Sequence, residues 1–81
     1  MATKKLLERI ETNPQILVGK PVIKGTRLSV QFILGLLAKG STIDEIMDEY
    51  DGIDKEDILA CLSFASHALE DNSFMPLGRA A

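Results

Sequence analysis

The chain has 81 residues, of which 46% are hydrophobic and 26% are charged, and its formal net charge is -3. These values are typical of one small folded domain and exclude a disordered chain. No apolar run approaches the roughly 18 residues that a membrane span needs, so we expect no membrane association. The N-terminal residues lack the apolar stretch of a secretory signal, and we therefore expect the protein in the cytoplasm.

The charge is unevenly divided along the chain. Residues 1–40 contain seven basic and two acidic residues, a net charge of +5, whereas residues 41–81 contain two basic and ten acidic residues, a net charge of -8. An anionic partner such as a nucleic acid therefore favours the first half, and a basic protein partner favours the second half.

Short extended pieces separated by turns are predicted for residues 1–29. The turn signals are Asn13-Pro14, Gly19-Lys20-Pro21 and Gly25-Thr26. Between them we predict strands at Gln15–Val18 and Pro21–Ile23, and a further strand near Glu8–Glu11. Because a two-stranded ribbon is marginal in water, we expect this arm to pair with a larger unit or with a second copy of the chain.

Three helices are predicted after this arm, and each follows a residue that caps helix N-termini. They cover residues 30–39 after Ser29, 43–50 after Thr42, and 55 to 71 after Asp54. Glu45 completes a capping box with Thr42, and Gly40 is placed to end the first helix in the left-handed conformation. The predicted fold class is mainly α. A trihelical helix-turn-helix bundle at 30–71 follows a short N-terminal β-ribbon arm at 1–29 and precedes a flexible tail at 72–81, in a single domain overall.

The faces of these helices predict the oligomeric state. The second helix has an apolar face opposite an acidic ridge, which consists of Asp44, Glu45, Asp48 and Glu49. The first and third helices are apolar around most of their circumference, so we expect a homodimer with these helices at the interface. The expected interface residues are Phe32, Leu36, Leu59, Leu62, Phe64 and Leu69. The alternative is a monomer in which the N-terminal strands and the tail cover these faces.

One string of residues is more specific than the general helix-turn-helix pattern. It comprises Asn13-Pro14, the segment Gly-Lys-Pro-Val-Ile-Lys-Gly-Thr-Arg at 19–27, Leu36-Leu37-Ala38-Lys39-Gly40-Ser41, Asp44-Glu45-Ile46, Tyr50, and Glu56-Asp57-Ile58-Leu59-Ala60. The string resembles the domain of unknown function family 433, small bacterial and archaeal proteins regarded as homeodomain-like and proposed to be antitoxins. The resemblance covers about residues 8–70. It implies a type II toxin-antitoxin pair, in which the chain binds and neutralises a PIN-like ribonuclease toxin.

The alternative function is that of a dimeric helix-turn-helix DNA-binding transcriptional regulator. The start of the third helix, Asp54 to Asp57, and the ridge of the second helix are acidic, which opposes contact with phosphates. If the protein binds operator DNA, we expect the ribbon to do so through Lys20, Lys24 and Arg27. The competing interpretation is that the lysines are solvated turn residues and that Arg27 braces the start of the second helix.

No enzyme activity, cofactor or metal site is predicted. His67 has no companion nucleophile and is expected to be a satisfied surface or interface histidine, and Cys61 is expected to be a small buried apolar residue. The tail is expected to be either a frayed terminus or a toxin-binding arm. The arm residues would be Phe74, Met75, Leu77 and Arg79.

Overall fold

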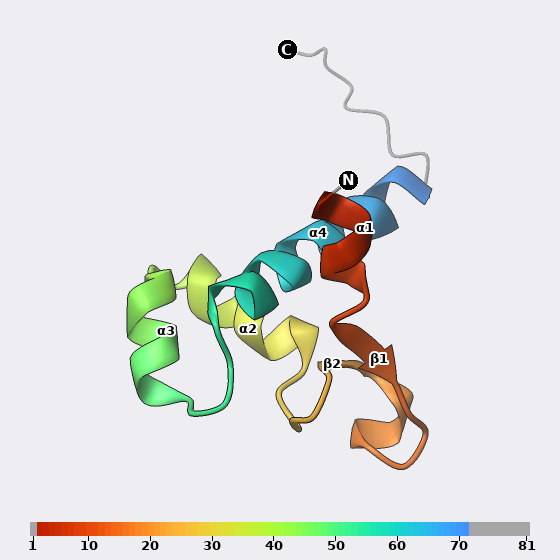
Figure 1. The fold of residues 1–81 in the computed structure, drawn as a ribbon, viewed down its shortest axis with the longest axis horizontal. Coiled ribbons are helices and arrows are strands. Elements are labelled where there is room, and N and C mark those ends of the chain that lie inside the picture. Colours follow the sequence, from red (N-terminus) through yellow and green to blue (C-terminus); the bar gives the residue numbers. More distant parts are fainter. Residues whose placement is uncertain (1, 72–81) are drawn as a thin grey trace.

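Four α-helices and a short antiparallel ribbon make up the computed structural model, which describes residues 2–71. The elements follow one another as α1 (Ala2–Leu7), β1 (Ile10–Thr12), the 3-10 helix η1 (Leu17–Gly19), β2 (Pro21–Ile23), α2 (Val30–Ala38), α3 (Ile43–Glu49) and α4 (Lys55–Asp71). In Figure 1, α3 lies at one side, the ribbon lies at the other, and α4 runs away from them beside α1. The prediction of a mainly helical fold with an N-terminal β-ribbon is confirmed.

The capping residues explain where the three main helices begin. Ser29 Oγ accepts a hydrogen bond from the Phe32 amide at 2.9 Å. Thr42 and Glu45 form the predicted capping box, with bonds of 2.9 and 3.1 Å. These bonds satisfy amide groups that have no partner within the helix, so the boundaries follow from local sequence. The observed boundaries differ from the predicted ones by at most one residue.

The core lies where β2, α2, α3 and α4 meet. Its buried residues are Ile23, Val30, Ile33, Ile46, Ile58 and Cys61. Cys61 is fully buried, as predicted. Because Ile46 is turned into this core, the acidic ridge on α3 is exposed, which confirms the predicted faces of this helix.

The predicted strand at Gln15–Val18 is wrong, because this segment forms a turn followed by η1. The partner of β2 is β1, which lies close to the further strand predicted near Glu8–Glu11. The physical reason lies in Asn13: its side-chain oxygen accepts from the Gln15 amide at 2.9 Å, and its carbonyl accepts from the Ile16 amide at 2.8 Å. These bonds turn the chain at the point where a strand was expected to start.

The helix α1 was not predicted from the sequence. A helix of six residues is too short to be stable by itself in water, so its contact with α4 must stabilise it. The arm at residues 1–29 therefore contains a helix as well as the ribbon, and this helix packs on the helical core. None of the helices within residues 2–71 combines the length and the apolar composition of a membrane span.

Candidate partner-binding surfaces

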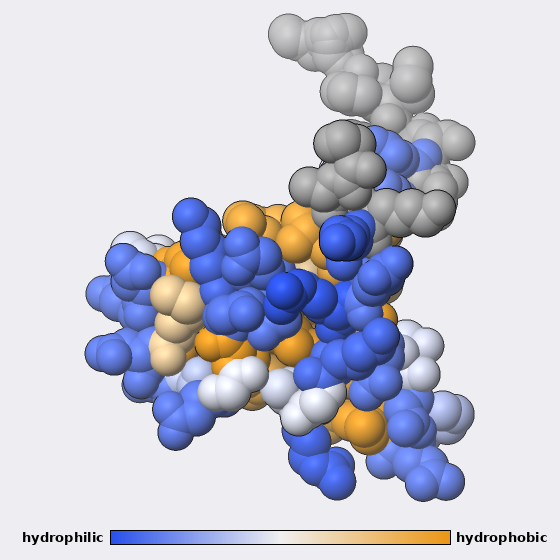
Figure 2. All heavy atoms as spheres, in the orientation of Figure 1, coloured by the Kyte–Doolittle hydropathy of each residue, from blue (hydrophilic) through white to orange (hydrophobic). Residues whose placement is uncertain are grey.

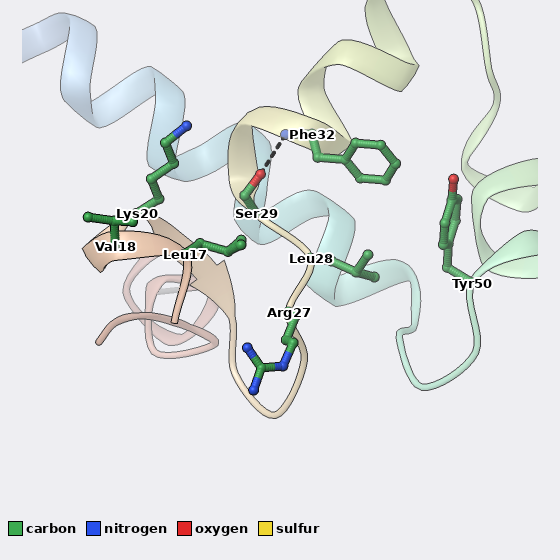
Figure 3. Close-up of a pocket in the computed structure, with 8 residues that line it drawn as sticks. All are labelled: Leu17, Val18, Lys20, Arg27, Leu28, Ser29, Phe32 and Tyr50. Carbon is green, nitrogen blue, oxygen red and sulfur yellow. Dashed lines mark hydrogen bonds between the residues drawn. The ribbon is translucent and has the colours of Figure 1, made fainter. Parts of the chain in front are cut away.

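An open groove lies between η1, the turn before α2, and the end of α3 (Figure 3). Its volume is about 540 Å³. The residues around it are Leu17, Val18, Lys20, Arg27, Leu28, Ser29, Phe32 and Tyr50. Phe32 and Tyr50 form one wall, where their rings pack edge to face with centroids 5.5 Å apart. The groove is therefore an apolar surface with two cations beside it.

The backbone at the opposite wall of the groove is strained. Leu17 and Val18 have φ values of 51° and 57°, in the left-handed region that favours glycine. For a residue with a Cβ atom this conformation costs about 1–2 kcal/mol. Val18 is 91% exposed and Leu17 is 41% exposed, so the strain accompanies two apolar side chains that face solvent.

The three basic residues predicted to contact DNA do not share one site. Lys20 and Arg27 both line the groove, and both are exposed. Lys24 is also exposed, but it lines a different hollow, together with Arg9 and Glu56. The structure thus brings two of the three cations together and places the third on another part of the surface.

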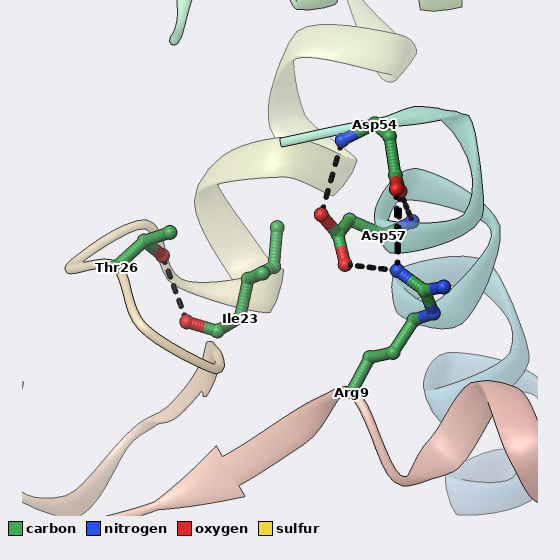
Figure 4. A network of polar contacts seen from close by, with 5 residues as sticks. All are labelled: Arg9, Ile23, Thr26, Asp54 and Asp57. Carbon is green, nitrogen blue, oxygen red and sulfur yellow. Dashed lines mark hydrogen bonds and ion pairs between the residues drawn. The ribbon is translucent and has the colours of Figure 1, made fainter. Parts of the chain in front are cut away.

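Arg9 forms salt bridges with Asp54 and Asp57 at the start of α4 (Figure 4). The sequence analysis did not single out this arginine. Its Nη1 atom lies 3.0 Å from Asp57 Oδ1 and 3.2 Å from Asp54 Oδ1. The expected brace between Arg27 and the start of α3 is absent from the part of the chain that the structure describes. Arg27 lies instead in the exposed turn after β2, at the groove.

Hydrogen bonds, with a smaller contribution from charges, shift the pKa values of Arg9 and Asp54. The hydrogen bond to Asp57 is the main cause of the raised pKa of Arg9. The Asp57 backbone amide, which donates to Asp54, is the main cause of the lowered pKa of Asp54, and the charge of Arg9 adds to it. Both groups are therefore held in their charged forms at the start of α4.

The first turns of α4 lie beside the N-terminal segment. Glu56 and Leu59 of α4 line a hollow with Lys5 and Leu6 of α1. In DNA-binding helix-turn-helix proteins, this end of the last helix enters the major groove. Such a contact would here place the exposed carboxylates of Asp54 and Glu56 against phosphate groups.

The six residues expected at a dimer interface do not surround a single hollow. Phe32 and Leu36 line one hollow on α2, Leu59 lines the hollow beside α1, and Phe64 lines a furrow between α2 and α4. Leu62 and Leu69 are 43% and 58% exposed, and they lie seven residues apart on the same side of α4. Of the six residues, Phe32 and Leu36 therefore share one surface on α2, and Leu62 and Leu69 share another on α4.

The structure shows the immediate surroundings of His67 and Cys61, the two side chains that the sequence analysis considered for catalytic chemistry. His67 Nδ1 lies 3.0 Å from the Ser63 carbonyl oxygen of its own helix. Burial raises the pKa of the Cys61 thiol to about 12, so the reactive thiolate is not formed near neutral pH. Across residues 2–71, no three His, Cys, Asp or Glu side chains are grouped so that they could hold a metal ion. The predicted arm residues Phe74, Met75, Leu77 and Arg79 lie outside the described residues.

Sequence reasoning missed the groove because its walls come from three separate segments. Leu17, Leu28 and Tyr50 were not singled out as binding residues, although they line it. The available signal was the apolar segment Ile16-Leu17-Val18 directly before Gly19, which does not alternate as a half-exposed strand would.

Comparison with known proteins places the chain in a family. The family model described as Protein of unknown function (DUF433) matches residues 10–65. The fold is similar to that in the crystal structure of a DUF433 member protein from Anabaena variabilis ATCC 29413, with a TM-score of 0.73 and 23% sequence identity, over 86% of this chain and 69% of that chain. Among curated proteins, none matches this chain. Since the family model spans well over half of its residues, the chain belongs to the DUF433 family.

Proposed function

We propose that this protein is the antitoxin of a type II toxin-antitoxin pair and that it binds and neutralises a PIN-like ribonuclease. The proposal starts from the family resemblance carried by residues 19–27 and the helices that follow. The structural feature that best supports the proposal is the acidic ridge on α3.

The ridge presents four exposed carboxylates on one short helix: Asp44, Glu45, Asp48 and Glu49. Figure 2 shows hydrophilic side chains gathered over α3. Apart from the bond that Glu45 Oε1 accepts from the Thr42 amide, the described residues provide these carboxylates with no hydrogen bond or salt bridge. A ribonuclease needs a basic surface to hold RNA phosphates, and a row of carboxylates is complementary to such a surface. The ridge would therefore inhibit the enzyme by occupying the surface that binds RNA.

The proposal predicts that a PIN-like ribonuclease is encoded next to the gene for this protein, and the test mixes that ribonuclease, purified alone, with the full-length protein. We expect a stable complex and loss of RNA cleavage at equimolar concentrations. The ridge variant carries Asp44→Asn, Asp48→Asn and Glu49→Gln, and we expect it to inhibit at least about tenfold less well. Glu45 is left unchanged because it caps α3.

A matched control removes three exposed carboxylates elsewhere, through Glu8→Gln, Asp51→Asn and Glu70→Gln. This control should inhibit like the wild-type protein. If the wild-type protein neither binds the ribonuclease nor slows cleavage, the proposed function is wrong. If the ridge and control variants inhibit equally, the ridge is not the contact surface.

We also propose that the protein acts as a homodimer through Leu62 and Leu69 of α4, whose exposure leaves apolar surface uncovered. Light scattering should report a dimer for the wild-type protein and a monomer for the double variant Leu62→Glu with Leu69→Glu. The control variant, Thr12→Glu with Gln15→Glu, adds the same charge at two exposed positions outside α2 and α4 and should remain dimeric. A monomeric wild-type protein would overturn this part of the proposal.

Regulation of transcription through operator DNA is the second candidate function, because Lys20, Lys24 and Arg27 are all exposed. The variant Lys24→Glu with Arg27→Glu should abolish binding to DNA from its own promoter while leaving neutralisation of the ribonuclease intact. If this variant still binds the promoter with an unchanged dependence on salt, the ribbon is not the DNA-binding surface.

A further inference from the structure

The groove between η1 and α2 lies outside the acidic ridge and has the opposite charge, so the proposed contact with a ribonuclease does not use it. We infer that this groove binds a short extended segment of a partner protein, in which one bulky apolar side chain is flanked by carboxylates. This inference does not depend on the ribonuclease.

The apolar part of the groove favours an apolar side chain of the partner segment, which we call the anchor. Phe32 is 42% exposed and Leu17 is 41% exposed, while Leu28 and Tyr50 are half-buried around the same hollow. Single exposed apolar side chains are common, but several of them around one concave surface mark binding sites. An aliphatic or aromatic side chain placed between them would remove this surface from water.

The two cations of the groove, Lys20 and Arg27, favour carboxylates in the partner segment on either side of the anchor. Lys20 and Arg27 are exposed, and within residues 2–71 neither forms a salt bridge. In the view of Figure 3, their charged ends lie on opposite sides of the Leu17 side chain. An arginine and a lysine that are free to pair favour carboxylates, and the guanidinium can hold one through two parallel hydrogen bonds.

The strained backbone indicates that the groove is pre-formed. Two successive residues with side chains, Leu17 and Val18, are held in the left-handed conformation before Gly19, which has a φ of 80°. Strain of this kind collects at sites of function, where the surrounding structure maintains it. Here it holds the Leu17 and Val18 side chains at the mouth of the groove rather than in the core.

Nucleic acid fits the same surface less well. Phosphate-binding surfaces consist of successive cations, whereas this groove separates its two cations by apolar side chains. The third cation of the ribbon, Lys24, faces a different hollow. A duplex bound here would cover Leu17 and Phe32 without gaining a third phosphate contact from Lys24.

The test is a selection from a displayed library of random peptides of about 12 residues on the immobilised full-length protein. Binders are counter-selected on the variant Lys20→Glu with Arg27→Glu, which changes only exposed side chains. We expect an enriched pattern of one aromatic or aliphatic residue between acidic residues. Amide shifts on addition of the best peptide should map to residues 17–20 and 27–32.

Binding of that peptide, measured by fluorescence anisotropy, should weaken by about tenfold or more in the Lys20→Glu, Arg27→Glu variant. The control variant Lys39→Glu with Lys55→Glu has the same net charge and should bind like the wild-type protein. Phe32→Ala tests the apolar wall separately and should also weaken binding. Circular dichroism and the thermal midpoint establish that each variant is folded.

Three outcomes would overturn the inference. The first is that no peptide is enriched against the charge-reversed variant. The second is that the enriched peptides lack acidic residues or shift amides elsewhere in the chain. The third is that a short DNA duplex displaces the peptide and shifts the same amides at equal or lower concentration, which would assign the groove to nucleic acid.

Discussion

Arg9 Nη1 lies 3.0 Å from Asp57 Oδ1, and this contact joins residues that are 48 positions apart in the sequence (Figure 4). The other carboxylate oxygen of Asp57 accepts from the Asp54 amide at 3.0 Å, and the side chain is 12% exposed. The Asp57 side chain thus satisfies the Asp54 amide at the start of α4 and also binds Arg9, which lies between α1 and β1. This pair links the N-terminal arm to the helical core.

Replacement of Asp57 should therefore destabilise the whole domain. We expect Asp57→Ala to lower the free energy of unfolding by about 1–2 kcal/mol, because the variant loses the acceptor of the Asp54 amide and leaves Arg9 with one partner fewer. Asp57→Asn keeps an oxygen for the Asp54 amide and should cost less. Urea unfolding monitored by circular dichroism measures both values, and an unchanged midpoint for Asp57→Ala would contradict the assigned role.

The lowered pKa of Asp54 predicts a loss of stability in acid. A carboxyl group whose pKa is lower in the folded than in the unfolded state stabilises the fold above its unfolded pKa, and this contribution disappears as the pH falls through the folded value. The loss should begin below about pH 4. The side chain is 59% exposed, so solvent screening makes the effect small.

The measurement is a comparison of unfolding midpoints at pH 7 and at acid pH for the wild-type protein and Asp54→Asn. The difference between the two proteins should shrink as the pH falls, since the protonated carboxyl group of Asp54 and the amide that replaces it in the variant are both uncharged. A difference that stays constant down to about pH 2 would show that ionised Asp54 does not contribute.

Cys61 should be inert in the folded protein. It is fully buried, and burial raises the pKa of its thiol to about 12, so almost no thiolate is present at about pH 8. Ellman's reagent should react with the thiol quickly in about 6 M guanidinium chloride and only at the rate of unfolding in buffer. Rapid reaction in buffer would mean that the α2–α4 core opens far more readily than its packing indicates.

Removal of the strain at Val18 should stabilise the protein. Val18→Gly loses little packing because the side chain is 91% exposed, and glycine adopts a φ of 57° without steric cost. After the entropy cost of glycine, we expect a net gain of about 0.5–1 kcal/mol in the free energy of unfolding. Val18→Ala is the control, because it removes the exposed methyl groups and keeps the Cβ atom. Val18→Gly should be the more stable of the two, and the reverse order would show that the backbone there is not strained.

The sequence by itself determined the helices from α2 to α4. Their limits depend on capping residues that act within one turn, such as Ser29 and Thr42, so the information is local. The apolar and acidic faces of α3 also follow from spacing alone, and the same holds for the burial of Cys61 in α4.

Only the tertiary structure decided which strand pairs with β2, whether α1 forms, and which cations share a site. Strand pairing and a six-residue helix depend on contacts with distant segments, and the local pattern at Gln15–Val18 does not contain that information. The same is true of the charges, because Arg9 reaches Asp57 and Lys20 joins Arg27 only after the ribbon is packed on the helices. Hydrophobic periodicity indicates which face of a single segment is exposed to solvent. A site built from separate segments depends instead on how those segments pack together.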